Sequence, residues 1–396
     1  MNLVDLRNYI KTQKGYAFKS KWFIKAGIPI VKVKDFTDDS ISKENVDYIN
    51  DELACDFDRY LIDTNDVIIQ TVGSWASNPN SVVGKAVKVP SALKGALLNQ
   101  NAVKIIPTEK LDKKFLYYTL RTDDFKGYIV NTAQGSASQA SITLESIKNY
   151  NFHLPLLHTQ KRIADILSAY DDLIENNLKR IKLLEQAAQN IYKEWFVNLR
   201  FPGHENTPIN EETGLPEGWC KCPFNKVSIN NNRKRIPINS TERSKRQGNY
   251  RYYGATKAMD YIDDYIFDGR YLLIAEDGTV YDKEGNAFTQ LVEGKFWVNN
   301  HAHIISGDCL PVEFLYLAMK HYPIGHLITG AVQLKLSMKN LSRVDIINPS
   351  EEILQDFMSI VNPMINQVFT LDMQNQKLKA ARDILLPRLM NRTIEV

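Results

Sequence analysis

The stretch that decides the fold is residues 160–196, QKRIADILSAYDDLIENNLKRIKLLEQAAQNIYKEWF. Its apolar residues recur at alternating steps of four and three, and neither Pro nor Gly interrupts them. This heptad spacing is typical of a helix that packs against another long helix. At roughly 1.5 Å of rise per residue the helix would be about 55 Å long, long enough to act as a spacer. The seam positions are Ile163, Leu167, Tyr170, Ile174, Asn177, Ile181, Leu184, Ala188, Ile191 and Trp195.

A second ladder of the same kind occupies the end of the chain. Each of its seam residues follows its counterpart by 194 positions. Pro363 lies in its early part and predicts a kink or a late helix start there. Arg382 occupies a seam position, and we expect its charged end to reach solvent beside Tyr170. The seam positions are Phe357, Val361, Met364, Val368, Leu371, Asn375, Leu378, Arg382, Leu385 and Leu389.

The two ladders predict an antiparallel helix pair with one defined register. When Asn177 is placed opposite Asn375, every seam residue meets another seam residue. A paired polar layer in an apolar seam fixes the register at some cost in stability. The alternative is two unrelated amphipathic helices, each with a tolerated polar residue.

The repeat extends beyond the helices. Gln139 matches Gln333 and Pro155 matches Pro349 at the same offset, while residues 67–69 resemble residues 272–274 at a larger one. Drifting offsets indicate loop insertions between shared elements, and a period this long exceeds that of solenoid repeats. We therefore predict an α+β protein with a pseudo-two-fold internal repeat, in which two globular mixed α/β domains are separated by two long antiparallel coiled-coil helices. The predicted parts are a first recognition domain (1–154), a central helix (155–202), a second recognition domain (203–349) and a C-terminal helix (350–396).

Composition sets only broad limits on function. The net charge is +3, from 49 basic and 46 acidic residues, so nucleic-acid binding is allowed but must be argued from where the charges lie. No apolar run is long enough to span a membrane, and no signal peptide is evident. Four scattered cysteines, Cys55, Cys220, Cys222 and Cys309, do not form a disulfide framework, and the Cys220-x-Cys222 pair lacks zinc-site spacing. We expect reduced, structural cysteines in a cytoplasmic protein.

The most charged stretch is the candidate DNA-binding segment. Residues 233–251 contain seven basic residues and one acid, Glu242, with tyrosines interleaved at the end. Basic, amide and tyrosine side chains together can clamp phosphates and read base edges; a solubilising surface loop is the alternative. In the first domain, the turn-rich segment 71–80 is either a recognition loop or a plain surface loop. The candidate DNA-binding residues are Lys19, Lys21, Ser74, Trp75, Asn78, Asn80, Arg233, Lys234, Arg235, Arg243, Lys245, Arg246, Arg251, Tyr252 and Lys257.

Catalytic motifs are missing from the sequence. It contains no P-loop, no Gly-rich cofactor loop and no G-x-S-x-G nucleophile motif. His301-x-His303 could ligate a metal, but no third ligand is evident, so ordinary packing or hydrogen bonding is the preferred interpretation. We therefore assign no catalytic residue, no metal and no cofactor to this chain.

Four motifs, in this order along the chain, resemble one known family. They are GYAFKS at 15–20, LPLLHTQKRIA at 154–164, YYGATKAMDYIDDY at 252–265 and RDILLPRLM at 382–390. Together with the internal repeat they resemble the specificity subunit of type I restriction–modification systems over essentially the whole chain. The first domain departs from the family because it lacks the Leu-Pro-x-Gly-Trp opening found at 215–219, which raises the question of a shortened first strand.

The resemblance implies a non-catalytic subunit that binds double-stranded DNA. Each recognition domain would read one half of a split target through the major groove, and the helices would set the spacing between the halves. The subunit would recruit two modification subunits, which bind S-adenosylmethionine and methylate a flipped adenine. Restriction subunits, motor-nucleases that use ATP and Mg, would join for cleavage.

Two other functions remain as alternatives. A free-standing DNA-modifying enzyme is disfavoured by the missing catalytic motifs, and catalysis by the purified chain would revive it. A coiled-coil scaffold with two protein-binding modules is disfavoured by the basic, tyrosine-rich segment 233–253. Absent or salt-insensitive DNA binding would favour the scaffold.

Overall fold

The computed structural model describes residues 3–75, 82–136, 139–330 and 333–396. Its contacts divide the chain into a first unit, residues 1–175 and 375–396, and a second unit, residues 176–374. Two long helices, α5 (Leu157–Tyr192) and α10 (Glu351–Met390), each contribute one part to each unit. No helix within the described residues is both long and apolar enough to cross a bilayer.

The first unit is built on a four-stranded antiparallel sheet and a smaller three-stranded one. The four-stranded sheet has the order β2 (Ile10–Lys14), β9 (Ala102–Pro107), β5 (Val67–Gln70), β7 (Ala86–Lys88). The three-stranded sheet has the order β4 (Asp47–Ile49), β3 (Ile28–Val31), β8 (Leu97–Leu98), and β3 runs parallel to β8. The strands expected near 28–33 and 66–70 are therefore confirmed. The remaining elements include α1 (Asp51–Ala54), α2 (Lys113–Thr119), α3 (Asp123–Thr132), α4 (Leu144–Lys148), β1 (Leu3–Asp5), β6 (Val72–Gly73), β10 (Gln134–Ser136), β11 (Gln139–Ser141) and β12 (Asn151–His153).

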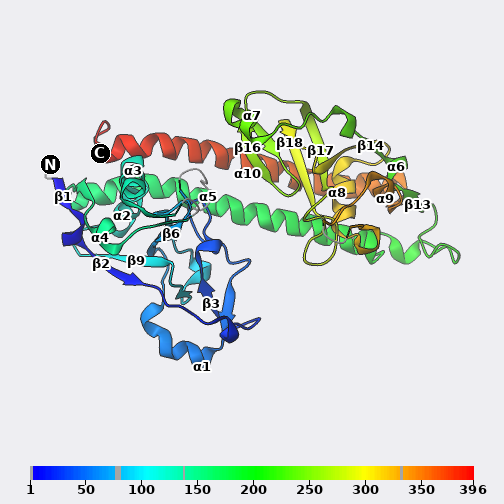
Figure 1. The fold of residues 1–396 in the computed structure, drawn as a ribbon. Helices are drawn as coiled ribbons and strands as arrows, with labels where there is room; N and C mark the ends of the chain where they lie inside the picture. The colour runs from blue at the N-terminus through cyan, green and yellow to red at the C-terminus, as the bar shows by residue number, and fades with distance from the viewer. Residues whose placement is uncertain (1–2, 76–81, 137–138, 331–332) are drawn as a thin grey trace. The chain divides into compact units, whose positions relative to one another are not determined.

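The second unit carries one six-stranded sheet. Its order is β14 (Ser228–Asn230), β19 (Ala302–Gly307), β17 (Phe267–Ala275), β18 (Thr289–Val298), β15 (Gln247–Tyr253), β16 (Ala258–Ile262). A separate pair joins β13 (Cys220–Pro223) to β20 (Asp345–Asn348). The helices are α6 (Phe224–Val227), α7 (Ser240–Lys245), α8 (Val312–Lys320) and α9 (Met338–Leu341), and α8 lies beside β17 and β18 in Figure 1.

The strand order confirms the internal repeat. The order β2-β9-β5-β7 in the first unit matches β14-β19-β17-β18 in the second, with every neighbouring pair antiparallel. Each unit also has an antiparallel hairpin, β3–β4 or β15–β16, whose first strand runs parallel to its neighbour. In the first unit, β7 pairs with β5 in one sheet and β8 pairs with β3 in another. In the second unit, the single strand β18 pairs with both β17 and β15, so the corresponding strands form one continuous sheet.

A strand at the start of the first domain is present in the described residues. Within the described residues, β1 forms three pairs with β12, whereas its counterpart β13 forms four pairs with β20. The chain thus keeps the strand even though the Leu-Pro-x-Gly-Trp opening is absent.

The predicted helix register agrees with a ring contact in the second unit, and the rest of the register stays a prediction. It places Ile163 opposite Leu389, and both are 1% exposed in the core of the first unit. It also places Trp195 opposite Phe357, whose ring centroids lie 5.7 Å apart in the second unit. Asn177 and Asn375 are buried, as seam positions require; that they face each other remains a prediction.

A late start of the C-terminal helix and an end of the central helix at Phe201 are not observed, while the alternative of a kink at Pro363 stays a prediction. The helix α10 starts at Glu351, well before Pro363, because Glu351 and Glu352 lie in its first turn, where acidic side chains favour a helix N-terminus. The central helix stops short of Phe201, since α5 ends at Tyr192 and continues only as a π-helical turn, Lys193–Val197. Leu199 then takes a left-handed conformation with φ of 56°.

The prediction that Arg382 reaches solvent is also wrong. Its side chain is buried, and Nη1 donates to Asp171 Oδ1 at 2.6 Å and to Asp39 Oδ2 at 2.8 Å, all within the first unit. Asp39 also pairs with Arg121, and Asp171 accepts from the Tyr118 hydroxyl at 2.7 Å. Burial opposes ionisation of Asp39, but Arg121 and Arg382 hold its pKa at about 2. We call these five residues, with Lys88, which lies 3.1 Å from Asp171, the buried ion network.

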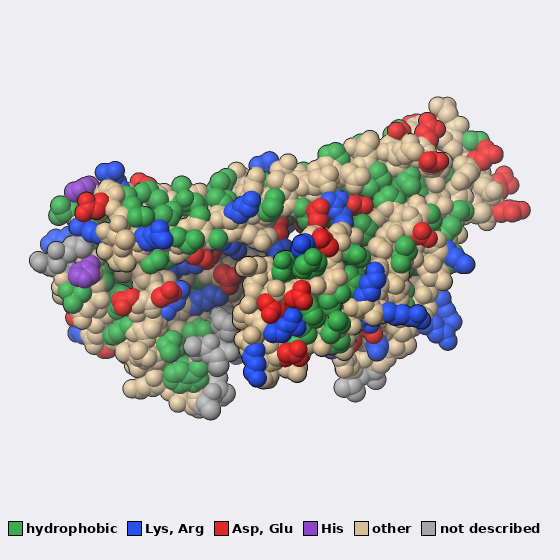
Figure 2. Space-filling view, turned by 90° about the horizontal axis from the view of Figure 1, so that it is seen from above, with side chains coloured by type: hydrophobic (Ala, Val, Ile, Leu, Met, Phe, Trp, Pro, Cys, Tyr) green, Lys and Arg blue, Asp and Glu red, His purple; other side chains and the backbone are tan. Residues whose placement is uncertain are grey.

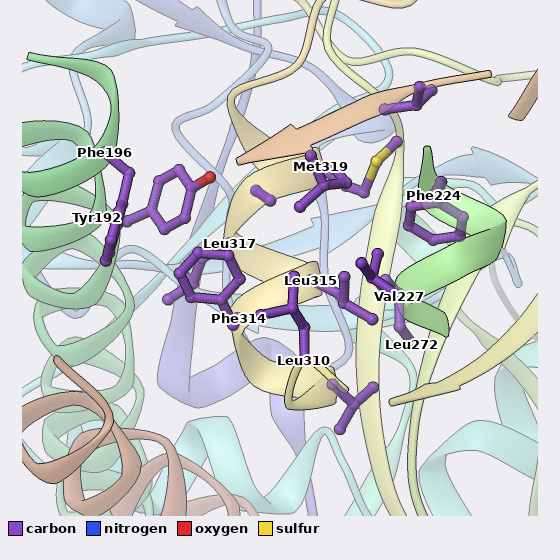
Figure 3. Close-up of a cluster of buried hydrophobic side chains, with 14 of the residues drawn as sticks. Tyr192, Phe196, Phe224, Val227, Leu272, Leu310, Phe314, Leu315, Leu317 and Met319 are labelled. Atoms are coloured by element: carbon purple, nitrogen blue, oxygen red, sulfur yellow. The ribbon is translucent and has the colours of Figure 1, made fainter. Parts of the chain in front are cut away.

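The core of the second unit is instead aromatic and aliphatic. Figure 3 shows Tyr192 of α5 and Phe196 of the following π-helical turn pointing toward Phe314 and Leu317 of α8, with Phe224 of α6 farther along the same cluster. The Phe196 and Phe314 rings meet edge to face at 4.9 Å, a favoured aromatic arrangement.

Candidate nucleic-acid interface

Three segments leave the same end of the central sheet in each unit. In the second unit β14 and β17 end where β19 begins, because both run antiparallel to β19. We call residues 231–235, 276–278 and 299–301 the loop end of the second unit. The equivalent loop end of the first unit comprises residues 15–22, 71–75 and 99–101, which follow β2 and β5 and precede β9. The equivalence is close, since the backbone bond from Thr71 N to Asn101 O recurs as Glu276 N to His301 O.

Arg235 connects all three segments of the second loop end. Its Nη1 donates to Glu276 Oε2 at 2.9 Å, to the carbonyl of Ala302 at 2.9 Å and to that of Asn300 at 3.2 Å. Its Nε donates to the Asn232 carbonyl at 3.1 Å. Burial would raise the pKa of Glu276, but the Arg235 hydrogen bond keeps that pKa below its ordinary value, so the pair stays charged. Arg235 therefore braces the loop end, and its predicted role as a DNA contact stays a prediction.

Asn232 and His303 form a second brace. The Asn232 amide donates to His303 Nδ1 at 2.9 Å, and His303 Nε2–H donates to the Leu336 carbonyl at 2.7 Å. Burial lowers the pKa of His303, so the imidazole is neutral in this arrangement. Hydrogen bonding is thus confirmed for His303, and His301 pairs with Asp277 at 2.8 Å. Among the described residues no group of three or more His, Cys, Asp or Glu could hold a metal ion.

Four further predicted DNA-binding residues make contacts within the second unit, and three of them are partly exposed. Arg243 lies 4.7 Å over the Tyr252 ring, and Arg246 pairs with Asp263 at 2.9 Å. Arg251 pairs with Asp372 of α10 at 2.8 Å. Tyr252 is 0% exposed, so the prediction that it contacts DNA is wrong. The three arginines hold α7, the hairpin and α10 together, and any DNA contact by them stays a prediction.

The remaining predicted cations of this unit are exposed. Arg233 and Lys234 lie in the 3-10 turn η9 (Asn232–Lys234), Lys245 ends α7, and Lys257 lies in the turn between β15 and β16. Their side chains are not committed to ion pairs with described residues, so they can meet phosphate oxygens. On the face shown in Figure 2, Lys and Arg side chains are interspersed with Asp and Glu.

A cavity of about 430 Å³ opens beside this loop end. Asn239, Asn300 and His301 bring amide and imidazole groups to it, and such groups can donate to and accept from base edges. Sequence reasoning missed these three as site residues, although the run Asn299-Asn300-His301 was visible as part of the repeat. The lining residues are Pro237, Ile238, Asn239, Arg243, Tyr252, Met259, Asn299, Asn300 and His301.

The first loop end holds four of the six predicted residues of the first domain. Lys19 and Lys21 are exposed beside η2 (Ser20–Trp22), and Lys19 Nζ lies 5.4 Å over the Trp22 ring. Ser74 and Trp75 are half-buried, and Trp75 Nε1 donates to the Ser136 carbonyl at 2.8 Å. Asn78 and Asn80 lie outside the described residues.

Comparisons with known proteins match this arrangement over most of the chain. The family model described as the type I restriction modification DNA specificity domain matches residues 1–186 and 219–380. The MjaIX type I restriction enzyme specificity subunit of Methanocaldococcus jannaschii is 26% identical over 317 residues, 74% of this chain and 71% of that protein. A putative type I restriction enzyme specificity subunit of Haemophilus influenzae is 32% identical over 143 residues, 36% of each chain.

A solved structure has the same fold. The type I restriction–modification system S subunit from M. genitalium aligns with a TM-score of 0.57 at 16% identity, covering 98% of this chain and 96% of that one. Because the family model matches both repeats, the chain belongs to the type I restriction modification DNA specificity domain family.

Proposed function

We propose that this chain is the DNA-binding specificity subunit of a type I restriction–modification complex, with one half of a bipartite target read at each loop end. The observation that carries the proposal is the equal placement of the two basic segments. Lys19 and Lys21 follow β2, and Arg233 and Lys234 follow β14, the equivalent strand of the repeat. Two equivalent surfaces suit two separate half-sites.

Within the second loop end the side chains divide by task. The exposed cations Arg233, Lys234, Lys245 and Lys257 would contact phosphates, which position the protein without specifying sequence. Asn239, Asn300 and His301 would face base edges in the major groove, where amides and imidazoles can discriminate bases. Arg235 and Asn232 would hold these groups in place without touching DNA.

The long helices would set the distance between half-sites. Two-fold readers commonly place half-sites about 34–36 Å apart, one turn of DNA, which leaves unread base pairs between them. The outer faces of the helices would dock two modification subunits.

Catalysis would belong to the partners. The modification subunits would supply S-adenosylmethionine and methylate an adenine flipped out of each half-site. Restriction subunits would supply the ATP- and Mg-dependent motor and nuclease. This chain would contribute recognition and assembly.

The deciding experiment is methylation mapping of DNA from cells that express this chain with its modification subunit. A split motif with methylated adenine in both halves is expected. Exchanging residues 215–348 for those of another family member should change one half only. A single unbroken motif, or methylation by the purified chain alone, would contradict the proposal.

A sharper version uses single side chains. Asn300→Ala should relax base preference at one position of one half-site, because the Asn300 side chain is exposed at the cavity while its carbonyl still accepts from Arg235. Asn225→Ala, at an exposed side chain of α6, is the matched control and should leave the motif unchanged. Equal motifs for both variants would move base reading to other residues.

A further inference from the structure

Two thiols lie side by side on strand β13. Cys220 and Cys222 are alternate residues of the strand, so both side chains project from the same face. Their Sγ atoms are 3.5 Å apart. Cys220 is exposed and Cys222 half-buried, and both are free thiols. Because Cys220 is exposed, its thiol is open to reagents in solution.

We propose that Cys220 and Cys222 form a redox-modifiable dithiol, which a peroxide such as hydrogen peroxide closes to an intrastrand disulfide. In the first step the exposed Cys220 sulfur attacks a peroxide oxygen, the O–O bond breaks, and a sulfenic acid and one water form. In the second step the Cys222 sulfur attacks the sulfenic sulfur and displaces hydroxide, which leaves as the second water. Two thiols are oxidised by two electrons, and one hydrogen peroxide is reduced to two waters.

The surroundings favour this division of roles. Burial raises the pKa of the Cys222 thiol, and its contact with Cys220 raises it further. A protonated, half-buried thiol is a slower attacker of peroxide than an exposed one, yet it is already in place to resolve the sulfenic acid. Cys309 also raises the pKa of Cys222, so any test must separate it from the pair.

Closure would distort the strand pair that carries the dithiol. A disulfide bond is about 2.05 Å long, so the sulfurs must approach by about 1.5 Å. Alternate residues of an extended strand lie about 6.6–6.8 Å apart at Cα, the upper end of what a disulfide spans. The backbone must therefore contract where Cys220 pairs with Asn348 and Cys222 with Ile346. Strained disulfides are readily reduced, which suits a reversible modification.

The distortion would reach a core residue. Trp219 directly precedes Cys220 and packs against Phe201 at 4.8 Å and Phe196 at 5.5 Å, measured between ring centroids. On the opposite strand, β20 leads within three residues into α10. Trp219 fluorescence should therefore change when the disulfide forms.

The test uses the full chain with Cys55→Ser and Cys309→Ser, which leaves only the dithiol. Brief treatment with hydrogen peroxide should lower the intact mass by two hydrogens, shift Trp fluorescence, and be reversed by dithiothreitol. Adding Cys222→Ser should instead give a gain of one or more oxygens at Cys220. Both variants are first compared by thermal unfolding, because the readouts require a folded chain.

Two results would overturn the proposal. One is gain of oxygen, with no loss of hydrogens, in the variant that keeps both cysteines. The other is loss of two hydrogens only in wild type, mapped to a bond between Cys222 and Cys309. Because the readouts are mass and fluorescence, they stand or fall independently of DNA recognition.

Discussion

The two halves of this repeat share a strand order but stabilise their long helices differently. The first unit buries the ion network around Arg382 and Asp171. Their counterparts, displaced by the repeat offset, are Ala188 and Ile365, which are 2% and 6% exposed in the apolar core of the second unit. The same backbone arrangement therefore accepts a charged pair or an aliphatic pair at equivalent positions.

The difference teaches what a buried charge adds. Removing charges from water costs several kcal/mol per ion, so a buried pair is weak evidence for stability, whereas breaking one is strongly destabilising. An apolar pair tolerates many partners, while Arg382 requires both Asp39 and Asp171 at fixed positions. We infer that the ion network favours one arrangement of the helices in the first unit. The apolar pair in the second unit imposes no such requirement on its neighbours.

The largest expected effect is from Arg382→Ala. The variant should lose about 3–5 kcal/mol of unfolding free energy, because Asp171 and Asp39 remain buried with fewer cations. Denaturant unfolding followed by hydrogen exchange should place the loss in the first unit. Arg388→Ala, an exposed neighbour on α10, is the control and should change stability little. Equal effects from the two variants would argue that the network carries no energetic weight.

A transplant from the second unit should restore part of that loss. The double variant Asp171→Ile with Arg382→Ala copies Ile365 and Ala188 and removes the Asp171 carboxylate, which Arg382→Ala alone leaves with Lys88 as its ion-pair partner among the described residues. We expect it to be destabilised by about 1–3 kcal/mol relative to wild type, since the Tyr118 hydroxyl still loses its acceptor. The same unfolding measurement checks it. A double variant less stable than Arg382→Ala alone would show that the two halves are not interchangeable here.

The next prediction distinguishes a residue that holds the second loop end together, Arg235, from one that contacts DNA phosphates, Arg233. Arg235→Met should weaken specific DNA binding by about tenfold, roughly 1.4 kcal/mol, with little change in salt dependence, because the brace touches protein. Arg233→Met should weaken binding less but lower the salt slope by about one. Affinity titrations at several salt concentrations, with the assembled complex, distinguish the two. A reduced slope for Arg235→Met would return Arg235 to the phosphate-contacting set.

The smallest effect is a change in pH dependence from His303→Gln. The folded-state pKa of His303 lies below its ordinary value of 6.5, so its contribution to stability is complete above pH 6.5 and is lost as pH falls toward the folded pKa. The variant should therefore lose less stability than wild type between pH 7 and pH 5, with a slope difference of at most about 1.4 kcal/mol per pH unit. Thermal unfolding across this range measures it.

Two other histidines help to interpret that measurement. His321 also has a pKa lowered by burial, so some slope should remain in the variant. His326→Gln, at an exposed side chain, serves as the substitution control in the same measurement. A wild-type slope in His303→Gln would mean that His303 is protonated or mobile in the folded state.

The helices and the repeat could be predicted from sequence because each depends on spacing along the chain. Seam periodicity gave the pairing of Trp195 with Phe357, and matched segments such as 67–69 and 272–274 gave equivalent strands. Helix ends were less predictable. The helix α10 begins twelve residues before Pro363 and continues through it, so this proline does not mark the start of the helix.

The sequence indicated which segments form the loop ends, but not which of their side chains are exposed. A run of basic residues does not reveal which of them face solvent, because that depends on acceptors far along the chain. Arg235 and Arg233 are two positions apart, yet only Arg235 reaches Glu276, 41 residues away. Likewise Asn239, Asn300 and His301 line one cavity because the sheet brings their segments together. Their spacing in the sequence does not predict this.

The Arg235 brace has a consequence for how recognition can change over generations. Segments 231–235, 276–278 and 299–301 share one guanidinium, so an insertion or rotation in any one of them disturbs the hydrogen bonds of the other two. New specificities should then arise by exchange of whole domains, or by substitution at side chains that the brace leaves alone, such as Asn300. Stepwise substitutions or insertions within a single segment would produce intermediate proteins that bind no DNA sequence specifically.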